Sequence, residues 1–415
     1  MLLNPGACLR KGAQGPQATG RLTDAGANAM TRVDMFERYP ADPLRLAVMV
    51  MLAAASVLAM TGELGRVLPP HGLWDFGAFV ASGRAAAEGL DPYGIYPLTP
   101  HVVLPGFESW NPNLNPPISA LLFQLFDLAE PQASLRVWLW ISVACYLATV
   151  VLLVRRYGQG IEGLLIAVWA FGLAGFWDTL FLGQIYLPLL LMAVGAWLLL
   201  ERQELLWSGI LIGLVVAMKP NFLVWPVLLF LSGHRRPALV SLAVAAAVSL
   251  IPAVVLGPGV YRQWLSLVAS DGERAFFLTN ASLSGLAARA GIPAAGTALG
   301  AALLLGLAAW AFRRRPAVMA ASSAALVASV LASPLGWIHY TLFLLPVLLH
   351  HWDRRAMWVV GGLLVVPVPF VIDQFAAGSG AQLTIGSVYG WAVLLCIVVV
   401  MLPRGDRSRR ASLAT

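Results

Sequence analysis

Apolar runs of helix length alternate with short polar segments along most of the 415-residue chain. A helix that crosses a bilayer core of about 30 Å needs roughly 20 apolar residues. The pattern therefore predicts an all-α, polytopic transmembrane helical bundle. We place spans at residues 44–61, 135–154, 163–181, 185–200, 237–256, 296–312, 317–333, 338–350, 356–372 and 385–402.

Two further apolar stretches do not fit a simple span. Residues 205–232 contain two apolar arms separated by Met218-Lys219-Pro220-Asn221, which predicts a helical hairpin with Lys219 at its tip, because proline interrupts a helix. Residues 117–129 are too short to cross unaided, so we interpret them as re-entrant or packed against the bundle. Together with the single spans, the hairpin gives about twelve crossings.

The basic residues predict the orientation, because Lys and Arg collect on the cytoplasmic side of membrane proteins. With the N-terminus inside, the residues up to Arg45 place 6 of the 27 basic residues inside, and clusters between the spans and at the C-terminus place 14 more there. Both termini are then cytoplasmic. Two long segments, residues 62–116 and 257–295, fall outside.

The expected organisation is a mobile cytoplasmic tail at 1–40, a transmembrane domain at 41–403 and a basic cytoplasmic tail at 404–415. Apolar residues at helical spacing between Trp74 and Leu90 predict an amphipathic helix in the first external segment, which would lie along the membrane surface. External connections this long are usually functional.

Composition agrees with a membrane protein and excludes a soluble enzyme. The chain is 59% hydrophobic and 11% charged, whereas soluble domains have about 25% charged residues. The net charge of +7 does not indicate a nucleic-acid partner, because most basic residues lie in clusters between apolar runs. The 3 cysteines form no CxxC pair and no Cys/His spacing typical of a metal site.

Three ionisable residues from separate segments fall on the predicted outer side. Asp75 is either a first-turn acid favoured by the helix dipole or a general base for an acceptor hydroxyl. Lys219 is one of only two lysines and is either a snorkelling helix-end lysine or a point charge for a phosphate. His339 follows the helix-breaking residues Pro334 and Gly336 and is either a packing residue or part of a site.

Weaker candidates accompany them on the same side. Asp91-Pro92-Tyr93-Gly94 is first a turn signature, and Gly183-Gln184 is first a connector between spans. Asn280-Ala281-Ser282 matches a glycosylation sequon, which is incidental if the chain is bacterial. The residues that we include in the candidate site with lesser support are Asp91, Tyr93, Asn115, Asp178, Gln184 and Trp337.

Several common signatures are absent from the sequence. It contains no Gly-rich phosphate loop, no Asp-x-Asp pair for a metal-bound nucleotide sugar and no nucleophile elbow. We therefore expect no cofactor and no metal, and substrates that reach the site from the membrane or the outer space.

The order of these segments resembles glycosyltransferase family 87, enzymes of the GT-C fold that use polyprenyl-phosphate sugars. The matching stretches, which together cover about residues 44–400, are Trp74-Asp75-Phe76, Asp91-Pro92-Tyr93, Asn115-Pro116-Pro117, Gly183-Gln184, Gly209 to Gly213 leading into Lys219-Pro220, Asn280 to Leu286, and Ser333-Pro334-x-x-Trp337-x-His339. Residues 1–40 match nothing in the family.

The resemblance implies a metal-independent hexosyltransferase of the bacterial inner membrane. It would move a sugar, most commonly mannose in the family, from a polyprenyl-phosphate donor to a lipid or glycan acceptor on the periplasmic face. It implies that Asp75 is the catalytic base, that Lys219 binds the donor phosphate and that His339 contacts donor phosphate or sugar. Asp178 departs from the family pattern, in which a neutral polar residue is expected.

Two alternative functions agree less well with the sequence. A transporter or lipid flippase would usually show internal repeats and a site near the bilayer midplane, and the sequence shows neither. A membrane acyltransferase would need a catalytic histidine accessible to a cytoplasmic thioester donor, whereas His339 is predicted on the outer side.

Overall fold

The computed structural model describes residues 43–68, 70, 72–94, 112–270 and 272–403. The chain divides into two compact units, Met1–Leu46 and Ala47–Thr415, and the account below concerns the second. The tails predicted at 1–40 and 404–415 lie outside the described residues. Within those residues the secondary structure is helical throughout, with one isolated β-bridge between Asn280 and Trp337 and no strand.

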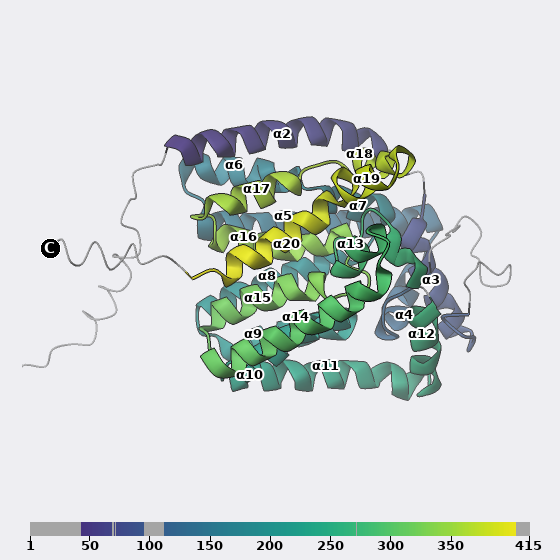
Figure 1. Ribbon diagram of the computed structural model, residues 1–415. Coiled ribbons are helices and arrows are strands. Elements are labelled where there is room, and N and C mark those ends of the chain that lie inside the picture. Colours follow the sequence, from purple (N-terminus) through teal and green to yellow (C-terminus); the bar gives the residue numbers. More distant parts are fainter. Residues whose placement is uncertain (1–42, 69, 71, 95–111, 271, 404–415) are drawn as a thin grey trace, which may run out of the picture. The chain divides into compact units, whose positions relative to one another are not determined.

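Five helical stretches are long and apolar enough to cross a membrane (Figure 1). They are α2 (Pro43–Val67), α5 (Pro131–Tyr157), α11 (Arg235–Val255), α14 (Pro293–Arg314) and Ser379–Met401, the last comprising α19 (Ser379–Leu383), the 3₁₀-helix η7 (Ile385–Ser387) and α20 (Val388–Met401). Their starts follow local rules. At α5, for example, the Glu130 side chain accepts hydrogen bonds from the backbone N–H groups of Gln132 and Ala133, which is an N-cap.

Two predicted spans are broken helices. Residues 163–181 consist of α6 (Gly160–Phe171) and α7 (Ala174–Leu182), bent by 44°. Residues 356–372 fall on α17 (Arg355–Leu363), α18 (Val368–Ile372) and η6 (Asp373–Ala377), with a bend of 80°. If each bent pair is one span, the described residues contain up to seven spans.

Six further apolar helices have 10–17 residues. They are Ile118–Leu128, comprising α4 (Ile118–Phe123) and η2 (Gln124–Leu128); α8 (Tyr186–Glu201); α9 (Leu205–Met218); Pro220–Leu231, comprising η3 (Pro220–Leu223) and α10 (Val224–Leu231); α15 (Val318–Leu331); and Ile338–His350, comprising η5 (Ile338–Leu344) and α16 (Leu345–His350). Helices this short do not cross a bilayer core of about 30 Å by length alone. The count of about twelve crossings therefore stays a prediction.

The predicted hairpin is present around Lys219. A side chain at Gly209 would meet the Pro237 carbonyl oxygen at 2.8 Å, and one at Gly213 would meet the Ser241 carbonyl oxygen at 2.6 Å. Residue numbers thus rise together along α9 and α11, so these helices run parallel and in close contact. Because α10 connects the end of α9 to the start of α11, the chain reverses direction directly after Lys219.

The helix predicted between Trp74 and Leu90 exists as α3 (Trp74–Ala87), and its place along the membrane surface stays a prediction. Eleven of its 14 residues are buried, so other helices cover most of its surface. Small residues permit this packing. A side chain at Gly83 would meet the backbone nitrogen of Gln124 at 2.8 Å, which places α3 directly against α4 and η2.

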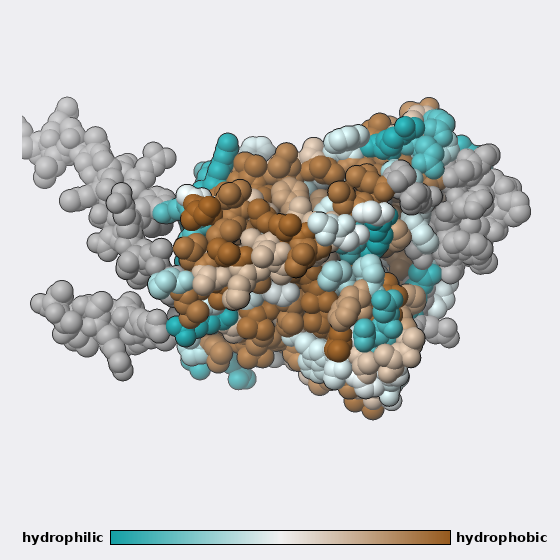
Figure 2. Space-filling model, turned by 90° about the horizontal axis from the view of Figure 1, so that it is seen from above, coloured by the Kyte–Doolittle hydropathy of each residue, from teal (hydrophilic) through white to brown (hydrophobic). Residues whose placement is uncertain are grey.

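The ends of the helices differ in charge. Arg156 at the end of α5 donates a hydrogen bond of 2.6 Å to Glu201 at the end of α8, and His234 before α11 contacts the Pro316 carbonyl oxygen after α14 at 3.0 Å. The arginine clusters therefore gather at one end of the helices. Figure 2 shows a broad apolar surface in the middle of one face, with hydrophilic residues towards the ends.

Candidate functional site

The opposite ends of these helices surround a cavity of about 1240 Å³. Tyr186 at the start of α8, Lys219 after α9 and Pro293 at the start of α14 all line it. The residues of the predicted site that line the cavity are Asp75, Asn115, Asp178, Gln184, Lys219, Trp337 and His339. The structure thus brings together most of the side chains that the sequence placed on one side of the membrane.

Asp75 lies in the first turn of α3 and is 6% exposed. Its side chain does not cap the helix, because Leu73 is at the N-cap without a side-chain hydrogen bond. Instead, Gln184 Nε2 donates a hydrogen bond to Asp75 Oδ2. The sequence therefore placed Asp75 correctly at the start of a helix. The hydrogen bond from Gln184 holds its carboxylate in the cavity wall.

Gly183 makes the approach of Gln184 to Asp75 possible. Its φ of 68° lies in the left-handed region, which glycine adopts without strain. A side chain here would also lie 2.7 Å from Phe76 Cβ. Trp138 Nε1 donates a 2.9 Å hydrogen bond to the Gly183 carbonyl oxygen. The connector between α7 and α8 is thereby fixed against the start of α3.

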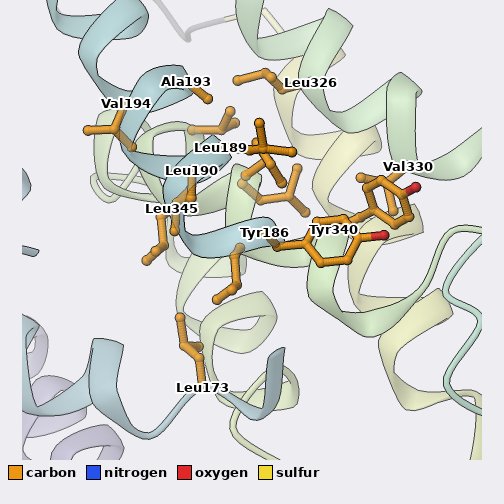
Figure 3. Packing of buried hydrophobic residues seen from close by; sticks show 14 of the residues in the cluster. Leu173, Tyr186, Leu189, Leu190, Ala193, Val194, Leu326, Val330, Tyr340 and Leu345 are labelled. Atoms are coloured by element: carbon orange, nitrogen blue, oxygen red, sulfur yellow. The ribbon is translucent and has the colours of Figure 1, made fainter. Parts of the chain in front are cut away.

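Lys219 is 7% exposed and extends over two aromatic rings. Its Nζ lies 4.4 Å from the ring centre of Tyr186 and 5.5 Å from that of Tyr340. Figure 3 shows both tyrosines at the edge of the aliphatic core, with their hydroxyls on the same side, away from Leu190 and Leu345. A snorkelling lysine would extend to the surface of the bundle, whereas this one is buried beside the cavity.

No salt bridge to Lys219 occurs within the described part of the chain. Its charge does interact electrostatically with that of Asp75. Cation–π contacts with two rings stabilise a desolvated ammonium by only about 1–2 kcal/mol each, which is far less than the cost of removing a charge from water. An anion in the cavity would compensate this charge.

His339 is 3% exposed, and its ring stacks on that of Tyr186 with centres 5.0 Å apart and an angle of 6°. Nε2 lies 3.2 Å from Asp178 Oδ2. The contact does not meet hydrogen-bond geometry, and neither ring nitrogen has a hydrogen-bond partner within the described residues. Asp178 Oδ1 in turn lies 2.5 Å from Arg66 Nη2. Asp178 is therefore a charged member of the cavity wall, paired with an arginine.

Asn115 lies in the cavity wall in a folded turn. Its side-chain Nδ2 donates to Asn113 Oδ1 at 2.9 Å, and its carbonyl oxygen accepts from Tyr93 Oη at 2.8 Å. Burial raises the pKa of Tyr93, so its phenol remains a proton donor in this contact. Tyr93 supports the wall from behind.

Asp91 and Tyr93 are not among the residues that line the cavity, and their part in the site stays a prediction. Asp91 is exposed, and its Oδ1 accepts a hydrogen bond of 2.8 Å from the Tyr93 backbone N–H. This is the turn that the Asp-Pro-Tyr-Gly signature indicates.

The Asn280-Ala281-Ser282 motif fastens the loop that carries Trp337 and His339. Asn280 Nδ2 donates to the Pro334 carbonyl oxygen at 3.2 Å, and its Oδ1 accepts from the Gly336 N–H at 2.9 Å. The Ala281 N–H donates to the Gly336 carbonyl oxygen at 2.7 Å. The motif therefore has a structural role in positioning the cavity wall.

Arg289, in α13 (Leu283–Arg289), stabilises the backbone around Asn280. It donates to the carbonyl oxygens of Phe277 at 2.7 Å and Asn280 at 2.9 Å, and to Ser387 Oγ at 2.6 Å. Burial lowers the pKa of Arg289 to about 10, so it remains cationic at neutral pH.

Sequence reasoning missed several residues of the cavity wall. The cavity wall also contains Arg66, Arg274, Trp264 and Asp373, which the sequence pattern did not single out. Trp264, in α12 (Gly259–Ser270), donates a 3.1 Å hydrogen bond to the Leu114 carbonyl oxygen. The short helix η4 (Gly272–Phe276) carries Arg274. A signal for Arg66 existed, because Glu63 and Arg66 are three residues apart in an otherwise apolar helix.

Comparison with known proteins identifies the family of the chain. The model of glycosyltransferase family 87 matches residues 113–334, which is more than half of the 415-residue chain. The match includes Asn115, Asp178, Gln184 and Lys219 from the cavity wall. No curated protein and no solved structure matches the chain. The chain belongs to glycosyltransferase family 87, and its fold is that of an all-helical membrane protein.

Proposed function

We propose that the cavity transfers a sugar, with mannose as the first candidate, from a polyprenyl-phosphate donor to the hydroxyl of a lipid or glycan acceptor. Family membership supports a glycosyltransferase. The observation that carries the choice of donor is Lys219, a buried ammonium beside the cavity without a salt bridge in the described residues. The phosphate of a lipid carrier would supply the missing negative charge.

The cavity groups support a direct displacement. The Asp75 carboxylate accepts the proton of the acceptor hydroxyl while its oxygen attacks the anomeric carbon of the sugar. The bond between that carbon and the phosphate oxygen breaks, and both electrons leave with the phosphate. The Lys219 ammonium stabilises the charge that accumulates on the phosphate. Attack and departure on opposite sides of the carbon invert its configuration.

Other residues of the wall have supporting roles in this proposal. Gln184 holds the Asp75 carboxylate through its hydrogen bond. His339, which lines the cavity, contacts donor phosphate or sugar. Asn115 and Trp337 line the space for the sugar and the acceptor. No step in this scheme requires a metal ion or a cofactor.

The proposal also assigns the cavity to the periplasmic side of a bacterial inner membrane. The arginine clusters lie at the ends of the helices away from the cavity, and such clusters mark the cytoplasmic side. Both termini are then cytoplasmic, and a bundle of GT-C type with about twelve crossings would require the short apolar helices to cross as well. An apolar carrier chain would remain in the bilayer while its phosphate enters the cavity.

The test is reconstitution of the full chain in lipid nanodiscs with polyprenyl-phosphate mannose and either membrane lipids or oligosaccharides as acceptors. Mass spectrometry should detect a mannosylated acceptor and free polyprenyl phosphate in equal amounts. Parallel liposome assays should show no protein-dependent movement of the donor across the bilayer. Protein-dependent flux without any mannosylated product would overturn the proposal in favour of a lipid transporter.

A further inference from the structure

Three side chains from different helices form a charged row in the cavity wall, which we call the cavity triad: Arg66, Asp178 and His339. All three line the cavity. Asp178 uses one oxygen for each neighbour, with Oδ1 at 2.5 Å from Arg66 Nη2 and Oδ2 at 3.2 Å from His339 Nε2. The carboxylate therefore connects α2, α7 and η5 at one point.

Asp178 and His339 are buried, so a charge on either side chain needs a partner of opposite sign. Arg66 cannot lose its proton in a protein, and its side chain is only 17% exposed, so anionic partners stabilise its charge. Glu63 lies 2.9 Å from Arg66 Nη1 and Asp178 lies 2.5 Å from Nη2. Arg66 also lies 4.0 Å above the ring of Phe181. Contacts with Glu63, Asp178 and Phe181 therefore hold the guanidinium in place beside Asp178.

Backbone packing fixes the distance between Asp178 and His339. A side chain at Gly175 would lie 2.8 Å from the Ile338 carbonyl oxygen, so α7 approaches the start of η5 without any intervening side chain. The Tyr186 stack fixes the plane of the imidazole ring. It does not fix rotation within that plane, and the carboxylate at one edge of the ring selects the orientation of the nitrogens.

We propose that Asp178, held by Arg66, is a positioning residue that orients the His339 imidazole toward the phosphate–sugar bond of the bound donor. This inference rests on the proposed function. It explains why a buried histidine has no hydrogen-bond partner for either ring nitrogen in the described residues. One edge of the ring faces the carboxylate, and the residue lines the cavity that we assign to the donor.

The chain contains a matched control at the other end of the bundle. Arg156, Glu201 and His350 form a distal triad, in which Glu201 lies 2.6 Å from Arg156 Nε and 3.5 Å from His350 Nδ1. None of these residues lines the cavity. Glu201→Gln therefore removes a carboxylate from an equivalent triad without touching the candidate site.

The experiment is a double-mutant cycle with Asp178→Asn and His339→Gln in nanodiscs, with Glu201→Gln as the control. We measure kcat and KM for polyprenyl-phosphate mannose and for the acceptor, and the Kd of the donor by equilibrium binding. We expect Asp178→Asn to lower kcat/KM for the donor by about 10–100-fold, as for partners that orient functional histidines in metal sites. The acceptor KM should change by less than about twofold, because the acceptor does not contact His339.

The decisive readout is coupling. In the His339→Gln background, Asp178→Asn should cost less than about threefold, because the residue that it positions is gone. Equal losses in both backgrounds, or a loss for Glu201→Gln as large as for Asp178→Asn, would overturn the inference. If Asp178→Asn does not fold, Arg66→Lys is used in its place, and a loss that is the same with and without His339 is again the contradicting result.

Failure of the proposed function is recognised separately. In that case the wild type forms no mannosylated product, or Asp75→Asn forms it as fast as the wild type. The donor Kd still decides the inference, because coupling between Asp178 and His339 in binding requires no turnover. Coupling in Kd supports the triad, and additive effects on Kd contradict it.

Discussion

The two triads at opposite ends of the same helices have nearly the same chemistry and different surroundings. In both, an arginine nitrogen lies 2.5–2.6 Å and a histidine nitrogen 3.2–3.5 Å from one carboxylate. Tyr186 at the start of α8 stacks on the histidine of the cavity triad, whereas Trp197 near the end of α8 contacts His350 of the distal triad edge-on. The same helix thus supports both sets.

The two triads differ in the exposure of their side chains and in how completely their polar atoms are hydrogen-bonded. The Arg66 side chain is 17% exposed and the Arg156 side chain 40%. Glu201 also accepts a 2.6 Å hydrogen bond from Tyr157 Oη, so water and neighbouring side chains complete the distal triad. In the cavity triad, the ring nitrogens of His339 have no hydrogen-bond partner among the described residues, and the triad lines the cavity. Residue types alone would not separate the two, whereas burial and incomplete pairing indicate which one meets a substrate.

Lys219→Met should produce the largest loss in this comparison. Methionine preserves the length and apolar stem of the side chain beside Tyr186 but removes the charge that we assign to the phosphate. We expect kcat/KM to fall by about 100–1,000-fold, the range for removal of one group that stabilises developing charge. Arg156→Met, which removes a cation from the distal triad, should stay within about threefold of wild type. Equal losses for both variants would contradict a site at the cavity.

Gly183→Ala should reduce kcat by about tenfold, since a small displacement of catalytic groups is costly. The new methyl group would press on Phe76 and move Gln184 away from Asp75. Gly233→Ala is the control, because Gly233 also has positive φ, at 92°, but no atom within 4 Å of the added carbon. Both variants should lose about 1–2 kcal/mol from the backbone conformation, and only Gly183→Ala should lose activity. An active Gly183→Ala protein would show that the approach to Phe76 is unimportant.

Asn280→Ala should act mainly on stability and reduce transfer only severalfold. It removes hydrogen bonds to Pro334 and Gly336 and leaves buried backbone groups unpaired, at a cost of about 2–4 kcal/mol. The measurement is thermal unfolding in nanodiscs together with kcat. His234→Ala, which removes one contact to the Pro316 carbonyl oxygen at the distal end, should cost about 1 kcal/mol or less. Equal destabilisation by both changes would contradict a special role of Asn280 in holding the loop that carries Trp337 and His339.

Glu201→Gln should have the smallest effect. Glutamine can still accept the hydrogen bond from Tyr157, and the partner Arg156 is substantially exposed. We expect a loss of about 1 kcal/mol or less in unfolding free energy and unchanged kcat. A tenfold decrease in kcat would reveal coupling between the two ends of the bundle, which the comparison does not predict.

The sequence predicted the meeting of distant polar residues well, for a physical reason. Polar side chains in an apolar bundle are tolerated at helix ends and breaks, so Lys219 beside Pro220 and His339 after Gly336 had to lie near one end. Their helices then bring them to one cavity. The glycine that fixes Gln184 beside Asp75 could be seen only in the structure, because its role depends on the distance to Phe76.

Other features were not predictable from hydropathy. Lipid chains are as apolar as a protein core, so the pattern does not distinguish residues that face lipid from residues that face other helices. Trp140 is 73% exposed, whereas Phe79 in α3 is 2% exposed, yet both lie in apolar segments. For this reason the sequence did not predict that other helices cover most of α3. The pairing of Arg66 with Asp178 was missed because it joins residues 112 positions apart.

The most direct test of the account is a single-turnover measurement of sugar transfer with the donor already bound, comparing Asp75→Asn with Asp91→Asn. Both changes replace one carboxylate by an amide of the same shape, and Asp91 is exposed and outside the cavity. We predict that Asp75→Asn lowers the transfer rate constant by about 100–10,000-fold, the usual contribution of a general base, while donor affinity is retained. Asp91→Asn should transfer at the wild-type rate. Transfer by Asp75→Asn at a rate close to that of Asp91→Asn would contradict the assignment of Asp75 as the base.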